Sequence, residues 1–235
     1  MVDLIHPKVL IVIPVRGIDA EDEKGPLMLG GKPLISYTIE AALACSSAQR
    51  VVVSTDSESV QKLSIQLGAE APFLRPKELS EKGVTLDRVL QHTLNIIIDE
   101  HGFSPELVLT LEIAHPFRPE GLLEQIINSL IEQNLDTVFA AFKENHAYWK
   151  ADEYGSLMRV GVQETTTRDK MNPMYREMAG LGIATKSEVL KTDGRFGQLI
   201  GLVPLQDFSS IIDTQDPDGL FIAESYLNMA RPGDA

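Results

Sequence analysis

Lys8-Val9-Leu10-Ile11-Val12-Ile13-Pro14-Val15-Arg16-Gly17 is an apolar run that ends at an arginine and a glycine. The run predicts a buried β-strand, and the glycine predicts a turn at its carboxyl end. The chain then restarts at Gly30-Gly31-Lys32-Pro33-Leu34-Ile35, where a helical pattern begins. A buried strand that ends in a glycine turn with fixed cations, and then leads into a helix, is able to hold phosphates above a sheet.

Apolar strand-like runs alternate with helical patterns along the rest of the chain. The predicted strands are Val9–Val15, Arg50–Ser54, Leu107–Leu111, Thr137–Phe142, Gly182–Thr185 and Leu199–Val203. The predicted helices are Pro33–Cys45, Glu58–Leu67, Thr85–Glu100, Pro119–Gln133, Lys186–Lys191 and Pro217–Met229. In the fourth helix, Pro119 suits the first position and Asn134 follows the last turn. This order predicts an α/β fold with a mainly parallel sheet covered by helices on both faces.

The alternation fails between Lys143 and Ala179, where the sequence is polar, contains several aromatic residues and shows no clear period. A segment of this length without a helix of its own is usually functional or docks elsewhere. We interpret it as a hairpin-like excursion that packs on a partner subunit. A mobile surface loop is the alternative, and the sequence leaves both open.

Composition limits the classes of partner. The chain has 235 residues, of which 43% are hydrophobic, and a formal net charge of −13. Such a charge disfavours nucleic acid and anionic membranes as partners, although local cations can still bind a nucleotide. The single cysteine, Cys45, lies in an apolar helical stretch and is expected to be a buried, unreactive thiol. Without a signal peptide or an apolar run of about 18 residues, the chain is expected to be cytoplasmic.

The opening loop offers cations for phosphates without a complete known motif. The segment from Gly25 to Lys32 is one residue out of register with the P-loop, and Pro33 stands where a magnesium-binding hydroxyl is needed. No G-x-G-x-x-G follows the strand, which argues against a dinucleotide site. Arg16 and Lys24, together with backbone amides, are nevertheless able to hold phosphates.

Two further strand ends carry polar residues. Val51-Val52-Val53-Ser54-Thr55-Asp56 ends in hydroxyls and an acid, which face either the ligand crevice or, as caps, the next helix. Arg75, before a proline, is expected in extended backbone. Asp213 follows two isoleucines, and its carboxylate is either a ligand for a hard divalent cation or a turn residue.

Other catalytic classes lack their signatures. The histidines show no spacing typical of metal ligands; they are His6, His92, His101, His115 and His146. No Gly-x-Ser-x-Gly elbow is present, and no cysteine–histidine pair is close in sequence. Hydrolase and zinc-enzyme interpretations are therefore disfavoured.

Taken in order, these segments resemble the acylneuraminate cytidylyltransferases (CMP-sialic acid synthetases) and their relatives that act on 2-keto-3-deoxy sugar acids. The resemblance runs from about Val9 to Glu224. It is carried by Ile13-Pro14-Val15-Arg16-Gly17, Gly31-Lys32-Pro33-Leu34-Ile35, Val53-Ser54-Thr55-Asp56, Gly68-Ala69-Glu70, Pro72-Phe73-Leu74-Arg75-Pro76, Arg168-Asp169, Met174-Tyr175-Arg176-Glu177, Ile212-Asp213-Thr214 and Ala223-Glu224.

The resemblance implies a three-layer α/β/α, Rossmann-like fold of the nucleotide-diphospho-sugar transferase type. It implies one cytidylyltransferase domain over residues 1–235, with a dimerisation arm at residues 143–179, and a homodimer. The implied reaction is the Mg²⁺-dependent transfer of CMP from CTP to a sialic-acid-like sugar acid, with release of pyrophosphate. Two alternatives stay open: a catalytically degenerate binding relative, and a nucleotidyltransferase with another acceptor.

The same resemblance assigns roles to individual residues. The implied catalytic residues are Arg16, Lys24 and Asp213, and Asp213 is also the implied metal ligand. The implied nucleotide-binding residues are Pro14, Arg16, Gly17, Lys24, Arg75 and Thr85. The implied residues of the sugar site are Glu112, Arg168, Tyr175 and Phe196.

The chain departs from the family at ligand-facing positions. The opening loop reads Ile18-Asp19-Ala20-Glu21-Asp22-Glu23, with four acids where the family is glycine-rich and cationic. These acids either oppose a triphosphate, recruit a second Mg²⁺ or point away. The segment from Leu111 to Arg118 replaces a Leu-Gln-Pro-Thr-Ser-Pro-Leu-Arg motif, so that the family glutamine becomes Glu112. Ile211 replaces the first acid of the family's Asp-x-Asp pair. The relatives acting on Kdo also lack this first acid and keep only the second.

Overall fold

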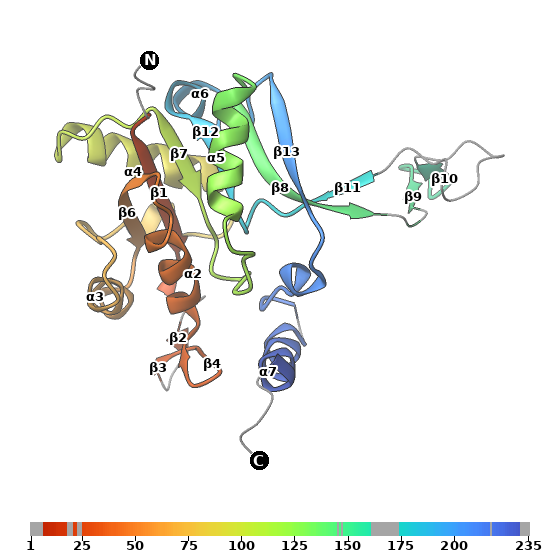
Figure 1. The fold of residues 1–235 in the computed structure, drawn as a ribbon, viewed down its shortest axis with the longest axis horizontal. Helices are drawn as coiled ribbons and strands as arrows, with labels where there is room; N and C mark the ends of the chain where they lie inside the picture. The colour runs from red at the N-terminus through yellow and green to blue at the C-terminus, as the bar shows by residue number, and fades with distance from the viewer. Residues whose placement is uncertain are drawn as a thin grey trace.

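The fold is built on a seven-stranded sheet (Figure 1). The computed structural model describes residues 7–17, 21–22, 25–144, 146, 148–160, 174–216 and 218–230. From one edge inward, the sheet contains β6 (Ala48–Thr55), β1 (Val9–Val15), β7 (Leu107–Thr110), β12 (Ile183–Lys186) and β8 (Thr137–Glu144). Beyond them, β11 (Met174–Glu177) and β13 (Ile200–Leu205) both pair with β8.

Most strands run in the same direction. β1 is parallel to β6 and β7, and β13 is parallel to β8, whereas β12 is antiparallel to both β7 and β8. β11 also runs against β8. The predicted mainly parallel sheet is therefore confirmed, and the carboxyl ends of β1, β6 and β7 meet at one edge.

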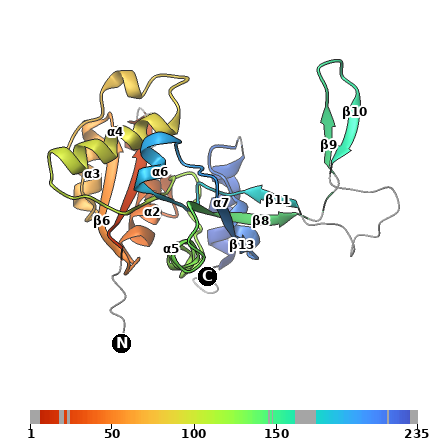
Figure 2. The ribbon, with the colours of Figure 1, turned by 90° about the horizontal axis from the view of Figure 1, so that it is seen from above.

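Helices cover both faces of the sheet (Figures 1 and 2). The helices α2 (Leu34–Leu43), α3 (Glu58–Gln66) and α5 (Leu122–Glu132) share one apolar cluster with the odd-numbered residues of β1. The helices α4 (Leu86–Asp99) and α6 (Ser187–Thr192) pack on the other face, against the even-numbered residues Leu10 and Val12. The predicted three-layer α/β/α architecture is confirmed.

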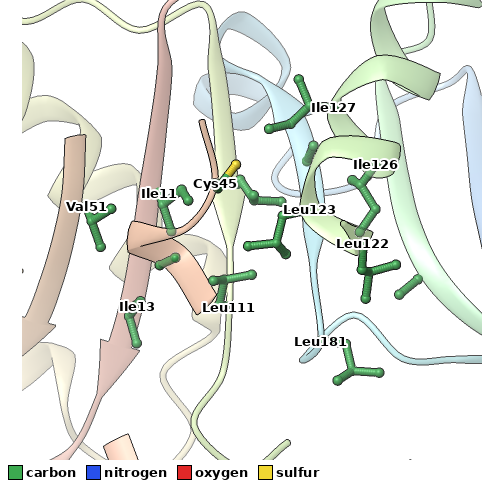
Figure 3. Close-up of a cluster of buried hydrophobic side chains, with 14 of the residues drawn as sticks. Ile11, Ile13, Cys45, Val51, Leu111, Leu122, Leu123, Ile126, Ile127 and Leu181 are labelled. Carbon is green, nitrogen blue, oxygen red and sulfur yellow. The ribbon is translucent and has the colours of Figure 1, made fainter. Parts of the chain in front are cut away.

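The larger apolar cluster shows why the sequence pattern sets the layers. Figure 3 shows side chains of α5 beside β1 and the segment after β7, with Cys45 among them. Leu122, Ile126 and Ile127 of α5 are at most 2% exposed. Full burial of such a side chain stabilises the fold by about 1.5–3 kcal/mol, so the apolar stripe of α5 holds this layer on the sheet.

The start of one helix differs from the sequence prediction. The helix α5 begins at Leu122 and not at Pro119, because Gly121 occupies the N-cap position in a left-handed conformation with φ 75°. Pro119 instead starts the preceding turn, since its carbonyl accepts a hydrogen bond from Leu122 N. Asn134 follows the helix as predicted and has a φ of 50°.

The opening loop forms two small hairpins. β2 (Glu21–Asp22) pairs with β3 (Gly25–Pro26), and β4 (Met28–Leu29) pairs with β5 (Lys32–Pro33) around the turn Gly30–Gly31. Lys32 Nζ lies 2.6 Å from the Glu40 carboxylate and 4.2 Å from the centre of the Tyr37 ring. This lysine is therefore engaged by α2.

The C-terminal helix α7 (Gly219–Ala230) packs against this loop. Glu224 Oε1 accepts a hydrogen bond of 2.8 Å from Gly30 N. Two short 3₁₀ helices, η1 (Lys77–Leu79) and η3 (Phe208–Ile211), complete the regular elements of the described chain. Within those residues, no helix has the length and apolar character needed to span a membrane.

The irregular region contains a hairpin that projects from the body of the molecule (Figures 1 and 2). β9 (Tyr148–Ala151) and β10 (Leu157–Val160) pair antiparallel. β11 then returns to β8, with Tyr175 opposite Lys143. The predicted hairpin-like excursion is confirmed for the described residues, whereas its packing on a partner subunit stays a prediction.

Candidate functional site

A cavity of about 250 Å³ lies at the carboxyl ends of β1 and β7. Its walls are formed mainly by four segments: the end of β1, the loop after β7, the loop between η1 and α4, and the first turns of α4. The lining residues are Pro14, Val15, Arg16, Arg75, Leu79, Glu81, Val84, Leu86, Val89, Glu112, Ile113 and Gln215. The position agrees with the general rule that open α/β sheets bind ligands beyond the carboxyl ends of their strands.

The floor of this cavity is held by Arg75 and Asp56. Arg75 is 4% exposed and donates hydrogen bonds from Nη2 to the Val15 carbonyl, at 3.2 Å, and from Nε to Ser80 Oγ, at 2.9 Å. Its Nη2 lies 3.6 Å from Asp56 Oδ1, which accepts a 3.0 Å hydrogen bond from Gly17 N. The buried charge of Arg75 is thereby compensated, and the turn after β1 is fixed.

The second wall, residues 112–118, is organised by Arg118. Its guanidinium donates to the carbonyls of His115 and Gly180, each at 2.8 Å, and of Leu181, at 2.9 Å. It also donates to the Glu112 carbonyl, and Glu112 N in turn donates to Gly180 O at 2.8 Å. Burial lowers the pKa of Arg118 to about 9, an effect that the charge of Glu112 opposes. Arg118 therefore fixes the backbone of Glu112, one of the residues that line the cavity.

Asp213 lies beside this wall. Its Oδ1 accepts a 2.9 Å hydrogen bond from Gln215 N, and Gln215 is part of the cavity lining. Thr214 donates to the Ala114 carbonyl from both N, at 2.9 Å, and Oγ1, at 3.1 Å. Asp213 is thus a turn residue through one oxygen, and its other oxygen, Oδ2, faces His115.

His115 is packed between Asp213 and Gly180. Its Nε2 lies 3.9 Å from Asp213 Oδ2, and its side chain is 12% exposed. A Cβ atom on Gly180 would lie 2.4 Å from His115 Cδ2, so only glycine leaves room for the ring. Burial is the main cause that lowers the pKa of His115, with Asp213 acting in the opposite direction.

Asp213 offers one carboxylate oxygen of the kind that a hard cation bound to phosphates can take. Mg²⁺ commonly takes one or two carboxylates from the protein and completes its shell with water and phosphate oxygens. Asp213 Oδ2 is the carboxylate oxygen available for this purpose, and the Asp213 side chain is 31% exposed. Among the residues placed by the structure, no group of three or more acidic, histidine or cysteine side chains forms a metal cage.

The cavity unites part of the predicted site. Pro14, Arg16, Arg75 and Glu112 line it, and Gly17 is bonded to its floor. Thr85 lies between two lining residues, at the N-cap position of α4.

Two predicted sugar-site residues lie apart from this lining. Tyr175 pairs with Lys143 across β11 and β8. Phe196 packs on Phe139 of β8 with ring centroids 5.9 Å apart. By strand alternation, Phe139 and Lys143 project from one face of β8, so the register places Tyr175 on the same face as the Phe196 contact.

Lys24 and Arg168 lie outside the described residues. The sequence interpretation did not assign roles to His115, Arg118 or Gln215. The sequence left open whether Asp56 caps the next helix or faces the ligand crevice. The cap of α3 is Ser57, which accepts a hydrogen bond from Val60 N, whereas Asp56 pairs with Arg75 at the cavity floor.

Comparison with known proteins agrees with the resemblance found in the sequence. A family model described as cytidylyltransferase matches residues 23–180. The chain belongs to the cytidylyltransferase family. It is therefore a nucleotidyltransferase by family, and the predicted resemblance is confirmed.

Three relatives show the range of this family. The CMP-N,N'-diacetyllegionaminic acid synthase of Legionella pneumophila is 27% identical over 228 residues, which cover 94% of this chain and 97% of that protein. The N-acylneuraminate cytidylyltransferase of Escherichia coli is 28% identical over 90% of this chain, which spans only 50% of that protein. The pseudaminic acid cytidylyltransferase of Campylobacter jejuni is 33% identical over 57% of this chain and 58% of that protein.

Solved structures confirm the fold. A 4-diphosphocytidyl-2C-methyl-D-erythritol synthase from Anaerococcus prevotii superposes with a TM-score of 0.70 at 15% identity, covering 95% of this chain and 99% of that one. A CMP:2-keto-3-deoxy-manno-octonic acid synthetase, determined with CTP, superposes with a TM-score of 0.69 at 13% identity, covering 95% and 100%.

Proposed function

We propose that this protein transfers CMP from CTP to a sialic-acid-like 2-keto-3-deoxy sugar acid in a Mg²⁺-dependent reaction that releases pyrophosphate. The observation that carries the proposal is the cavity at the carboxyl ends of β1 and β7, which brings Pro14, Arg16, Arg75 and Glu112 together. Relatives named as synthases or cytidylyltransferases of legionaminic, N-acylneuraminic and pseudaminic acids support a sugar acid as the acceptor.

In the proposed reaction, a sugar hydroxyl oxygen bonds to the α-phosphorus of CTP as the bond from that phosphorus to the bridging oxygen breaks. The hydroxyl proton is lost, and pyrophosphate leaves. Such transfers depend mainly on positioning and on compensation of the phosphate charge. Arg16 lines the cavity and is proposed to contact the phosphates, whereas Arg75 pairs with Asp56 and is proposed to shape the pocket.

The charge of the described lining leaves a requirement for further cations. Two arginines, Arg16 and Arg75, are opposed by two glutamates, Glu81 and Glu112. A triphosphate therefore needs positive charge from elsewhere, which we assign to Lys24 and to Mg²⁺. Bound at Asp213, Mg²⁺ would neutralise phosphate charge and withdraw electrons from the α-phosphorus.

We assign the acceptor to the end of the cavity formed by Glu112, Ile113 and Gln215. Tyr175, Arg168 and Phe196 are proposed to complete the sugar site from the arm and from the neighbouring face of the sheet. We further propose a homodimer in which the arm packs on the second subunit. Its hairpin exposes large apolar side chains, among them Trp149, Leu157 and Met158, which are 60%, 67% and 64% exposed.

A second candidate keeps nucleotidyl transfer and changes the acceptor. Glu112 lines the cavity, and a carboxylate directed into it would repel the carboxylate of a sugar acid and attract hydroxyl or amino groups. This observation favours an acceptor that presents hydroxyl or amino groups to Glu112. A sugar acid satisfies the condition only when its own carboxylate points elsewhere.

The decisive experiment is a two-stage assay. Thermal-shift titration with CTP, UTP, ATP and GTP, each with and without Mg²⁺, is expected to show stabilisation by CTP with Mg²⁺; a ligand at 100 times its Kd adds about 2.7 kcal/mol. Pyrophosphate release is then measured with a panel of sugar acids and of matched sugars without the carboxylate. Stabilisation by CTP without turnover of any acceptor would contradict the proposal and indicate a binding relative.

A further inference from the structure

The guanidinium group of Arg118 uses all of its hydrogen-bond donors. An arginine side chain carries five N–H donors in a fixed planar fork. The donors of Arg118 bind the backbone carbonyls of Glu112, His115, Gly180 and Leu181 and the hydroxyl oxygen of Thr38. Four of these five acceptors belong to the backbone, and none is a carboxylate. The side chain therefore joins the segment at positions 112–115 to the segment at positions 180–181.

Thr38 brings the helix α2 to the same arginine. Its Oγ1 accepts a 2.8 Å hydrogen bond from Arg118 Nη1 and donates to the Glu112 carbonyl at 3.4 Å. Thr38 is 0% exposed, so water cannot take the place of its hydroxyl without a rearrangement. Thr38 and Arg118 together form the wall clamp, which holds the Glu112 carbonyl from two sides.

The wall clamp is separate from the network that holds the cavity floor. Arg75, Asp56 and Gly17 make the floor contacts described above, and those hydrogen bonds have no residue in common with the clamp. Glu112 and Ile113, in contrast, line the end of the cavity assigned to the acceptor. A change in the clamp is therefore expected to move this wall and leave the floor in place.

We propose that Thr38 and Arg118 are positioning residues for the acceptor sugar, which act by fixing the backbone of Glu112 and Ile113. Neither residue belongs to the described lining of the cavity, so their effect passes through the wall. The inference rests on the proposed function in assigning the acceptor to this end of the cavity. It predicts that the clamp controls use of the acceptor and not use of CTP.

The test compares two substitutions of Thr38. Valine removes the hydroxyl, whereas serine keeps it. Thr38→Val should raise the KM for the acceptor about tenfold and leave the KM for CTP unchanged, because it leaves a donor of Arg118 without this acceptor. Thr38→Ser should restore most of the wild-type value. The matched control is Thr93→Val, because Thr93 is also a 0% exposed helical threonine, with Oγ1 bound to the Val89 carbonyl at 2.9 Å.

A second variant changes the other half of the clamp. Arg118→Lys keeps the positive charge but offers three donors in place of five, without the planar fork. It should raise the KM for the acceptor by at least as much as Thr38→Val, again at an unchanged KM for CTP. An unchanged acceptor KM in Thr38→Val would overturn the inference. Equal increases of both KM values would also overturn it, because they would show a general structural role.

Hydrogen exchange gives a readout that needs no turnover. The Glu112 amide donates to Gly180 O at 2.8 Å, so its exchange reports whether the wall is held. This amide should exchange about tenfold faster in Thr38→Val than in wild type or Thr38→Ser. Unchanged exchange would overturn the inference. Faster exchange in Thr38→Val, with no sugar acid used by the wild type, would contradict the proposed function and still support the clamp.

Discussion

Asp56 connects Arg75 to the turn after β1. One carboxylate oxygen of Asp56 lies 3.6 Å from Arg75 Nη2 and accepts a 3.0 Å hydrogen bond from Gly17 N. Arg75 is buried and also holds the Val15 carbonyl, so three segments of the cavity floor meet at this pair. The geometry of the proposed nucleotide pocket is therefore expected to depend on a residue that does not line it.

Substitution Asp56→Asn should test this dependence. Asparagine keeps an acceptor for Gly17 but removes the charge that compensates buried Arg75, so the free energy of unfolding should fall by about 1–3 kcal/mol. The KM for CTP should rise in the same variant. Urea unfolding and initial-rate kinetics give the two values. Lys62→Gln, in an exposed pair 3.5 Å from Glu58, should stay within about 0.5 kcal/mol of wild type.

A second prediction concerns Glu112. Its backbone is held by Gly180 and Arg118, and the residue lines the cavity. If it accepts a hydrogen bond from the acceptor sugar, Glu112→Gln should lower kcat/KM for that sugar by about 10–100-fold, the equivalent of about 1.5–3 kcal/mol. The KM for CTP should not change. Equal or improved kcat/KM for every sugar acid tested would show that the carboxylate only repels the substrate.

Cys45 gives a prediction for alkaline pH. The thiol is 6% exposed, and burial together with the neighbouring Glu124 raises its pKa from the ordinary 9.0 to about 11. The folded state therefore keeps the thiol protonated where the unfolded chain ionises it. The resulting stability is complete below pH 9 and is lost as the pH rises from about 9 to about 11, by at most about 1.4 kcal/mol per pH unit.

This predicted loss of stability can be checked by measuring the free energy of unfolding across this pH range for wild type and Cys45→Ala. The wild-type curve should fall more steeply than that of the variant, because lysines and tyrosines titrate equally in both. Parallel curves would show that Cys45 ionises normally in the folded protein.

The arm offers a prediction about assembly. The β9–β10 hairpin exposes Tyr148, Trp149 and Tyr154, which are 37%, 60% and 85% exposed. Replacement of residues 148–160 by a short Gly-Ser linker should turn the proposed dimer into a monomer in light scattering. Tyr154→Ser alone, at the turn of the hairpin, is the milder control. A dimer that persists after the replacement would place the interface elsewhere.

The sequence predicted the layers well because the local spacing of apolar residues shows which face of a helix or strand is buried. The run Val9–Val15 became β1 with unchanged bounds, and the apolar stripe of Leu122, Ile126 and Ile127 became the buried face of α5. The predicted start of α5 was wrong because Gly121 adopts a left-handed conformation, which the spacing of apolar residues does not indicate.

The site was only partly predictable, because its key contacts join distant segments. Arg118 binds carbonyls near positions 115 and 180, and His115 meets Asp213 through a contact of two loops. The sequence marked the segment Leu111–Arg118 as a departure from its family, which was the available signal. Nothing local to His115 indicates that Gly180 and Asp213 enclose its ring.

Gly219 gives the last prediction, because it packs closely against the backbone of Asp213. A Cβ atom on Gly219, the first residue of α7, would lie 1.8 Å from the Asp213 carbonyl oxygen and 2.9 Å from Thr214 Cα. These are backbone atoms, which cannot rotate aside as a side chain can. Gly219→Ala should therefore displace the loop, lower the free energy of unfolding by at least about 1–3 kcal/mol and weaken divalent-cation binding. Thermal unfolding and metal titration measure both effects, with Ile222→Ala, 48% exposed on the same helix, as the control. If Gly219→Ala kept wild-type Tm and metal affinity, the contact between α7 and Asp213 would not position the proposed ligand.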